Sequence, residues 1–372
     1  MSHFCGSSAQ SRLFYLSTTT ALLSIVSSVV AQDDISVLLA PADSVVYESS
    51  LTQAVTGPIT GEPISLPYAN VLPLPDGPIG DPARTYTFCL SQALTGSTWA
   101  VAQQESVMVE ANRHPNVKIL AYNSNNDPLR QVADLDTCAA QNVDGIVVWP
   151  HSVAPLSPQI AKLHSDGFVV VGMERTVNTQ DYSSWVYLDN AKATADLAAA
   201  VCERLGGTGL VVETDGAIGS SPQILRRAGF VDALAEQCPD VTVEFTQPTD
   251  YSRSQGYRVA LDFLQANQDR DIGAWYTQYT EIGIGVDQAL KDYDRTDIPQ
   301  YSIVDGKAAV QAVQAGIFTA VAPWTPVHGD LALRIAIHHV LDMDVPKNIL
   351  LGQPPLITTE NAEEALQHTW PG

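Results

Sequence analysis

Three apolar runs decide the fold of this chain: VKILAY at residues 117–122, GIVVWP at 145–150 and GFVVVGM at 167–173. Each run is almost continuously apolar, as expected for a strand that is covered on both faces of a parallel sheet. A stretch with helical periodicity separates each run from the next. This alternation of strand and helix predicts a doubly wound parallel sheet with helices on both faces.

The same alternation continues along the chain and falls into two series, which predict two α/β lobes. A chain of 372 residues, 45% of them hydrophobic, is long enough for two such cores. The first series has strands at 85–91, 116–122, 144–149 and 168–173, with helices at 98–113, 128–142 and 155–167. The second has helices at 191–205, 221–237, 253–268, 280–292, 307–315 and 327–342, with strands at 208–213, 240–246, 272–277, 300–304 and 318–322.

The first 31 residues have the layout of a secretory signal peptide. Arg12 precedes an uncharged, largely apolar stretch that ends with the small residue Ala31, and two acids follow at once. We expect cleavage after Ala31, because serines and threonines dilute the stretch too much for a retained anchor. Cys5 lies before the apolar stretch and therefore cannot carry a lipoprotein lipid. The protein is expected to be periplasmic or secreted.

Residues 32–84 form a separate segment that is rich in proline and has no Lys or Arg before Arg84. Proline fixes the backbone angle and removes a hydrogen-bond donor, which excludes long helices here. We predict an extended N-terminal arm or linker that is draped over the following domain.

The charge of the chain argues against two classes of partner. The formal net charge is -22, and removal of residues 1–31 takes away Arg12 and no acid, which leaves -23. Such a surface repels nucleic acid and anionic membranes. A simple role in solubility explains the charge better than a cationic ligand does.

Four cysteines remain after cleavage, and export to an oxidising compartment permits disulfides. Cys202 and Cys238 fall near the ends of two predicted helices that flank one strand, so we favour a bridge between them. Cys89 and Cys138 are predicted to lie at opposite edges of the sheet and to remain two buried thiols. No Cys-x-x-Cys motif is present, and His338-His339 has no third ligand in view, so we expect neither a metal nor a cofactor.

A series of short motifs resembles the periplasmic sugar-binding proteins of the ribose-binding type, which deliver solutes to ABC importers. The resemblance covers about residues 85–365 and rests on the order and spacing of its parts. The matching segments are NSNNDPLRQVADLDTCAAQNVDGIVVWP (123–150), VVGMERT (170–176), YLDN (187–190), GAIGSSPQILRRAGFVDAL (216–234), TEIGIGVDQAL (280–290), IVDG (303–306) and PPLITTENAEEAL (354–366).

The resemblance implies a type I periplasmic binding fold, in which two doubly wound lobes are joined by a three-stranded hinge and hold a solute between them. The first lobe would comprise residues 85–189 and 325–353, and the second 190–324 and 354–372. Parallel sheets bind ligands beyond the carboxyl ends of their strands. The polar and aromatic residues that interrupt the apolar runs fall at those ends, as Trp149, Glu174 and Trp324 do.

The resemblance also suggests individual ligand contacts. In the first lobe Trp99 retains an aromatic contact of the family, and Ser97 stands where the family has an amide. Glu174-Arg175 replaces the family's Asp-Arg pair, whose charged groups bond to sugar hydroxyls. In the second lobe Asp305 matches the family's late aspartate.

Three positions depart from the family pattern and replace polar groups with apolar or aromatic ones. Ile224 stands where the family has an arginine, Tyr279 where it has an asparagine, and Trp324 where it has a hinge-side glutamine. With Trp99 and Trp149, these aromatics would suit either the faces of a pyranose ring or a cage around a small ammonium-type solute.

Four other residues are not assigned to the ligand site, or only as one of two alternatives. Asp189 falls at the first predicted crossing, where a hinge role competes with ligand contact. Tyr276 is expected to be structural. Arg226 and Arg227 are expected to be solvated helix residues that pair with surface acids.

The sequence therefore favours a monomeric, non-enzymatic receptor that binds a sugar-like solute and passes it to an ABC permease by hinge closure. A sensor that presents the closed form to a chemoreceptor or histidine kinase is the alternative. An enzyme has no positive support, because the chain has no Gly-x-Ser-x-Gly, His-Glu-x-x-His or Walker A motif. A related transcription regulator would need a basic helix-turn-helix where this chain has an export signal.

Overall fold

The computed structural model describes residues 35–50, 54–304, 306–367 and 369–370. The predicted signal peptide and the predicted ligand residue Asp305 lie outside this part of the chain. Within it, none of the helices combines the length and the apolar character that crossing a membrane requires.

The first lobe is built on a seven-stranded parallel sheet with the order β1-β14-β8-β7-β6-β4-β5. All five residues of β6 and five of the six residues of β7 are buried, which explains why their sequences are apolar throughout. The prediction of a strand covered on both faces is wrong for β5, which is the edge strand of the sheet and has intermediate and exposed residues only. The strands are β4 (Tyr86–Gln92), β5 (Val117–Asn123), β6 (Gly145–Trp149), β7 (Val169–Glu174), β8 (Ser184–Leu188), β14 (Asn348–Leu351) and β1 (Val45–Tyr47).

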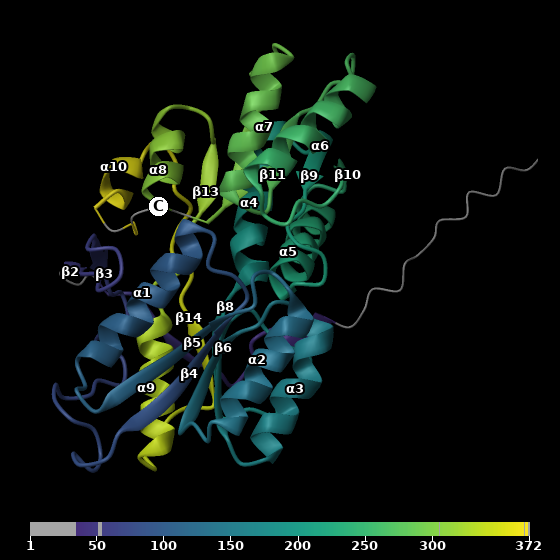
Figure 1. Ribbon diagram of the computed structural model, residues 1–372. Coiled ribbons are helices and arrows are strands. Elements are labelled where there is room, and N and C mark those ends of the chain that lie inside the picture. The colour runs from purple at the N-terminus through teal and green to yellow at the C-terminus, as the bar shows by residue number, and fades with distance from the viewer. Residues whose placement is uncertain (1–34, 51–53, 305, 368, 371–372) are drawn as a thin grey trace, which may run out of the picture. The chain divides into compact units, whose positions relative to one another are not determined.

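Helices cover both faces of this sheet, as Figure 1 shows. α2 (Pro128–Ala140) and α3 (Val153–Ser165) lie on one face, and α1 (Thr98–Asn112) and α9 (Gly329–Val340) on the other. Alternate residues of each strand point to opposite faces, so Val147 and Val148 belong to two different hydrophobic clusters. Nearly all of α9 is buried, and its two buried charged residues, Asp330 and Arg334, form an ion pair with each other.

The second lobe is built on a five-stranded parallel sheet with the order β10-β9-β11-β12-β13. Its strands are β9 (Thr208–Thr214), β10 (Asp240–Phe245), β11 (Ala274–Thr277), β12 (Gln300–Ile303) and β13 (Ala320–Ala322). Its helices are α4 (Asn190–Leu205), α5 (Ser221–Gln237), α6 (Arg253–Ala266), α7 (Thr280–Asp292), α8 (Lys307–Gln314) and the short α10 (Ala362–Ala365).

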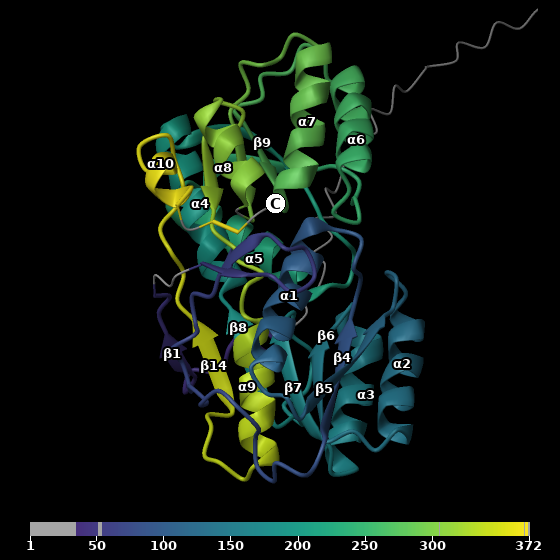
Figure 2. The ribbon, with the colours of Figure 1, turned by 60° about the vertical axis from the view of Figure 1, so that its left-hand side comes forward.

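The chain passes between the lobes three times. The crossings lie between β8 and α4, between β13 and α9, and after β14, where Ile357 forms a bridge with Val321 of the second lobe. Figure 2 shows β14 in the first lobe and α10, which follows it, in the second. The predicted fold class, two doubly wound α/β lobes joined by three chain crossings, is confirmed.

Three strands of the first lobe have no counterpart among the predicted elements: β8, β14 and β1. β8 is well buried, but it has the sequence SWVYL, with a serine and a tyrosine that interrupt its apolar pattern. β14 and β1 are only four and three residues long. Short strands whose pairing is decided by distant chain segments give little local signal.

The proline-rich arm is packed into the first lobe along much of its length. β1 extends the sheet by pairing with β14, and β2 (Ala54–Thr56) and β3 (Pro63–Ser65) form an antiparallel hairpin after the short 3-10 helix η1 (Ile35–Leu38). Leu66, Tyr68, Leu74 and Ile79 are buried and belong to the main hydrophobic cluster. The arm is therefore part of the lobe's core.

Buried charged side chains of the first lobe hold the arm by its backbone. The carboxylate of Glu105 accepts hydrogen bonds from the amides of Ile59 and Thr60, each at 3.1 Å. The guanidinium of Arg334, on α9, donates to the carbonyl oxygens of Tyr68 at 3.0 Å and Val71 at 2.5 Å. These side chains provide hydrogen-bond partners for backbone amides and carbonyl groups of the arm that would otherwise be buried without partners.

The structure pairs all four described cysteines. Cys202 and Cys238 are joined, with 6.0 Å between their Cα atoms. Cys89 and Cys138 are joined as well, with a Cα separation of 5.9 Å. The prediction that this second pair would remain free thiols is wrong. Cys89 is the fourth of the seven residues of β4, in mid-strand, where α2 packs over it and brings Cys138 within reach.

Candidate functional site

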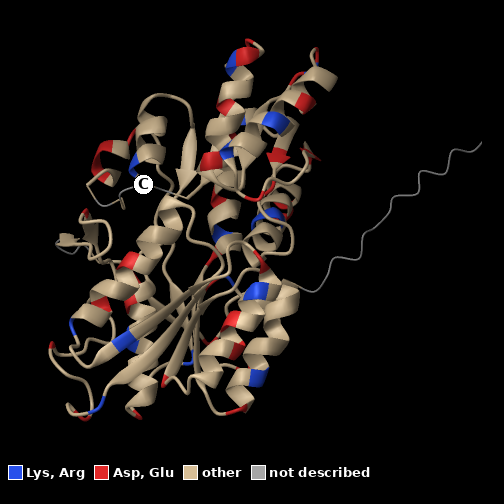
Figure 3. Ribbon diagram, in the orientation of Figure 1, with Lys and Arg blue, Asp and Glu red and all other residues tan. Residues whose placement is uncertain are grey.

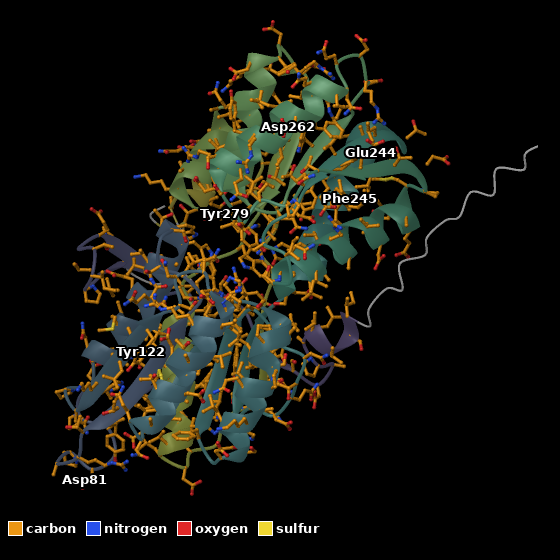
Figure 4. All side chains as sticks on the ribbon, turned by 45° about the vertical axis from the view of Figure 1, so that its right-hand side comes forward. Asp81, Tyr122, Glu244, Phe245, Asp262 and Tyr279 are labelled. Atoms are coloured by element: carbon orange, nitrogen blue, oxygen red, sulfur yellow. A yellow bond between two sulfur atoms is a disulfide. The ribbon has the colours of Figure 1, made fainter. Side chains whose placement is uncertain are left out.

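A cavity of about 350 Å³ lies between the two lobes, at the carboxyl ends of the strands. Trp149 and Glu174 are the last residues of β6 and β7, and Tyr279 precedes α7 in the second lobe. Figure 4 shows Tyr279 at the end of the second lobe that adjoins the first. The wall is formed by Leu94, Gly96, Ser97, Trp99, Asn125, Asn126, Trp149, Glu174, Arg175, Pro222, Arg226, Asp250, Tyr251, Ser252, Tyr279, Val304 and Trp324.

The carboxylate of Glu174 fixes the indole rings of the wall. It accepts a hydrogen bond from Trp149 Nε1 at 2.7 Å on one oxygen and from Trp324 Nε1 at 3.0 Å on the other. Trp99 Nε1 donates to the backbone oxygen of Trp324 at 3.3 Å, and the rings of Trp99 and Trp149 lie 5.0 Å apart. Glu174 therefore holds the indoles of Trp149 and Trp324, and Trp99 is held beside them by the Trp324 backbone.

Arg175 follows Glu174 and is 5% exposed. Its Nη1 donates to the backbone oxygen of His151 at 2.7 Å, and its guanidinium carbon lies 4.8 Å from the centre of the Trp149 ring. Its Nε is buried without a hydrogen-bond partner and lies 3.8 Å from the Glu174 carboxylate. Burial lowers the pKa of Arg175, and the positive charge of Arg226 lowers it further.

Arg226 reaches the cavity from the second lobe, and the prediction of a solvated helix residue is wrong for it. It is 3% exposed, and its Nε donates to Asn190 Oδ1 at 2.9 Å and its Nη1 to the backbone oxygen of Gln278 at 2.6 Å. Its guanidinium carbon lies 4.9 Å from the centre of the Trp324 ring. Pro222 and Phe230 are also buried and stand four residues away on either side, so this face of α5 is turned inward.

The neighbouring Arg227 lies outside the cavity wall and is partly exposed. It pairs with Asp215, which is buried at the end of β9 and not on the surface. Gln278 links this region to the site, since its side-chain amide donates to Glu213 at 2.8 Å and to Asp215 at 3.0 Å. Burial raises the pKa of Glu213 well above its usual range, and the nearby charge of Asp215 raises it further.

A strained loop before α6 contributes a wall residue that the sequence reading did not identify. Tyr251 packs edge-on against Tyr279, with 5.9 Å between ring centres, and its hydroxyl lies 3.1 Å from Ser220 Oγ. A Cβ atom on Gly216 would lie 2.0 Å from its ring, so only glycine fits there. Tyr251 follows the weakly patterned β10, and no motif marked it.

Backbone strain concentrates at this cavity. In the described part of the chain, ten non-glycine residues have positive φ, and six of them line the cavity: Asn125, Asn126, Glu174, Asp250, Tyr251 and Val304. Such conformations persist where surrounding structure holds them, and they cluster at binding sites. The strain therefore supports this cavity as the functional site.

The structure brings most of the predicted ligand residues together at this wall. Ser97, Trp99, Trp149, Glu174, Arg175, Tyr279 and Trp324 all line it. Ser97 also caps α1, where its Oγ accepts from Ala100 N at 3.2 Å. Asp189 caps α4 through a bond from Lys192 N at 2.9 Å and does not line the cavity. Tyr276 stacks on Phe230 in the core, with 4.2 Å between ring centres.

The two lobes touch beside the cavity through hydrogen bonds. Thr176 N of the first lobe donates to Ser221 Oγ of the second at 2.7 Å, and Val153 N donates to Gly219 O at 3.0 Å. Together with the Glu174–Trp324 bond, these contacts hold the lobes together around a space of small-molecule size.

Two lobes joined by three crossings, with an aromatic and charged cavity between them, define a solute-binding protein. Residues 88–341 match the family described as periplasmic binding protein domain. The match covers more than half of the chain, which therefore belongs to this family of solute binders and not to an enzyme family.

Relatives and solved structures agree with this assignment. A xylitol-binding protein of Mycolicibacterium smegmatis is 28% identical over 255 residues, which is 68% of this chain and 72% of that protein. An ABC transporter solute-binding protein from Mycobacterium smegmatis, solved with bound glycerol, superposes with a TM-score of 0.70 at 26% identity over 77% of this chain and 99% of that one. The fructose-binding periplasmic domain of a hybrid two-component system shares the fold, with a TM-score of 0.71 at 20% identity over 76% and 93%.

Proposed function

We propose that this protein is an exported solute-binding component of an ABC importer and that it binds a sugar or polyol in the cavity between its lobes. The observation that carries the proposal is the set of indoles fixed by Glu174 beside two buried guanidinium groups. Apolar ring faces suit the C–H surface of a sugar or polyol, and the guanidinium groups donate hydrogen bonds to its oxygens. The names of the relatives support this class of solute.

Hinge closure would couple binding to delivery. Wall residues come from both lobes, so a solute that contacts both favours the arrangement in which the lobes meet. The permease would then recognise the surface of the solute-loaded form. A predicted export signal at residues 1–31 is consistent with a site of action outside the cytoplasm.

Purified mature protein screened by thermal shift against sugars and polyols tests the binding. A solute at about a hundred times its dissociation constant adds roughly 2.7 kcal/mol of stability. Tyr279→Ala removes a wall residue and should weaken binding at least about tenfold. Tyr257→Ala, on α6 of the same lobe and outside the wall, is the matched control. Equal binding by the two variants would contradict the assignment of the cavity.

A sensory role is the second candidate, because the fold is shared with the periplasmic domain of a two-component system. The same closed form would then regulate a kinase or chemoreceptor. Stimulation of the ATPase of a reconstituted permease by solute-loaded protein supports import. Stimulation of a neighbouring kinase without any effect on a permease would support sensing.

A further inference from the structure

We infer that the solute carries a carboxylate, as a sugar acid or an acidic polyol does, and that the guanidinium groups of Arg175 and Arg226 hold it from opposite lobes. This inference rests on the proposed function and specifies the class of solute that the same cavity takes.

Two positive charges are buried at the wall of one cavity. Arg175 comes from the first lobe and Arg226 from the second, and both line the cavity while being 5% and 3% exposed. Each is near enough to influence the other, since the charge of Arg226 lowers the pKa of Arg175. A buried cation is costly unless a negative group compensates it.

The described residues supply one buried carboxylate for these two guanidinium groups. Glu174 forms an ion pair with Arg175, 3.8 Å from its Nε, but that separation is beyond hydrogen-bond distance, and each Glu174 oxygen already accepts an indole N–H. Arg226 bonds to two neutral oxygens, those of Asn190 and Gln278, and makes no ion pair with any residue in the described ranges. Asp250, the other described acid of the wall, is exposed.

Arg175 also has an unused donor. Its Nε is buried and has no hydrogen-bond partner among the described residues. A buried donor left unpaired costs about 1–3 kcal/mol, so a ligand oxygen that reaches it restores that energy. A carboxylate brings the opposite charge and can accept two parallel guanidinium N–H bonds, whereas a neutral hydroxyl brings no charge and cannot match this geometry, and this favours an acid.

The indole faces argue against a cationic solute. Arg175 already lies over Trp149 at 4.8 Å, and Arg226 lies over Trp324 at 4.9 Å. An ammonium group would have to share these faces with two cations of its own sign. An anionic solute instead gains from both guanidinium groups, and its carbon skeleton can still contact Trp99 and Tyr279.

Matched pairs of neutral and acidic solutes test the inference by isothermal titration calorimetry on the unmodified mature protein. The probes are D-galactose with D-galacturonate, D-xylose with D-xylonate, and D-glucose with D-gluconate, with xylitol and glycerol as neutral polyols. The acid of at least one pair should bind about tenfold or more tightly than its neutral partner. Raising the salt concentration from about 0.05 to 0.5 M should weaken acid binding more than neutral binding.

A charge-matched pair of variants assigns the effect to the cavity. Arg226→Gln should lower the affinity for the acid at least about tenfold and reduce its preference over the neutral partner. Arg270→Gln removes the same charge from an exposed pair with Glu244 and should change neither value. Circular dichroism and the thermal midpoint show whether each variant is folded, and Arg175→Gln, which removes the other guanidinium of the wall, serves in its place if Arg226→Gln is not.

The possible outcomes separate the two proposals. Neutral solutes that bind as tightly as their acids, or more tightly, overturn the acidic solute and leave the proposed function in place. An acid preference that Arg226→Gln and Arg270→Gln reduce equally also overturns it, because the effect would then come from net charge alone. A complete absence of binding by neutral sugars, polyols and acids overturns the proposed function itself.

Discussion

Replacement of Glu174 by glutamine tests the central contact of the cavity. The substitution keeps the shape of the side chain but leaves one oxygen where the carboxylate has two. The native oxygens accept Trp149 Nε1 at 2.7 Å and Trp324 Nε1 at 3.0 Å. In Glu174→Gln one indole N–H would face an NH₂ group, so two donors would oppose each other.

The expected size of the effect follows from these two bonds. A hydrogen bond to a charged acceptor contributes about 1.5–3 kcal/mol, and a buried donor without a partner costs about 1–3 kcal/mol. Removal of a buried negative charge offsets part of this loss. We therefore expect the free energy of unfolding to fall by about 2–3 kcal/mol.

Urea denaturation of the mature protein measures this change, and a double-mutant cycle with Trp324→Phe isolates the bond. The phenylalanine has no N–H, so the coupling energy should be at least about 1 kcal/mol. Glu236→Gln, an exposed substitution on α5, should change stability by no more than about 0.5 kcal/mol.

The result that would refute this reasoning is specific. If Glu174→Gln and Glu236→Gln have the same stability and the cycle shows no coupling, Glu174 does not anchor the indoles. The geometry of the wall would then depend on backbone packing, and solute affinity should survive the substitution.

Three further predictions concern other parts of the molecule. Replacing Cys89 and Cys138 by alanine opens a loop of 49 residues and should cost about 4 kcal/mol in guanidinium unfolding, whereas an unchanged midpoint would show that the bridge does not form. Gly216→Ala should displace the Tyr251 ring and weaken solute binding, while the thermal midpoint of the solute-free protein changes little. If the variant binds the solute as tightly as the unmodified protein, the ring is not part of the site. Burial lowers the pKa of His328 to about 4, so below about pH 6.5 the unfolded chain binds the extra proton and stability falls as pH falls towards 4. In His328→Asn the free energy of unfolding should fall by up to about 3 kcal/mol less between about pH 6.5 and 4 than in the unmodified protein. An unaltered pH dependence would assign the loss of stability to other groups.

Much of the fold was accessible from sequence because the deciding signals are local. The apolar runs at β5, β6 and β7 and the helices between them have clear periodicity, and all were predicted. β8, β14 and β1 depend on pairing between segments far apart in the chain, which periodicity does not report. The proline content of the arm indicated extended chain, but not that its residues enter the hydrophobic core.

The residues of the site also divide into those that local sequence predicts and those that only the folded structure reveals. The first-lobe residues at strand ends were predicted because a strand end fixes their position. Arg226 was misjudged because a charged residue on a helix is usually solvated, and only the inward turn of α5 shows otherwise. Tyr251 depends on a strained loop that no motif describes. The charge of the chain is similarly uninformative about the site, since Figure 3 shows acidic and basic residues interspersed over both lobes.

The way the arm is fastened has a practical consequence for anyone who produces this protein. The family match begins at residue 88, which invites an expression plasmid that starts there. Such a truncation would remove the arm's carbonyl oxygens, to which Arg334 donates hydrogen bonds, and the arm's amides, which donate to Glu105. It would leave these two charged side chains beneath a newly exposed apolar surface. Inclusion bodies obtained from that truncation would reflect the missing segment and would not show that the remaining protein is intrinsically insoluble.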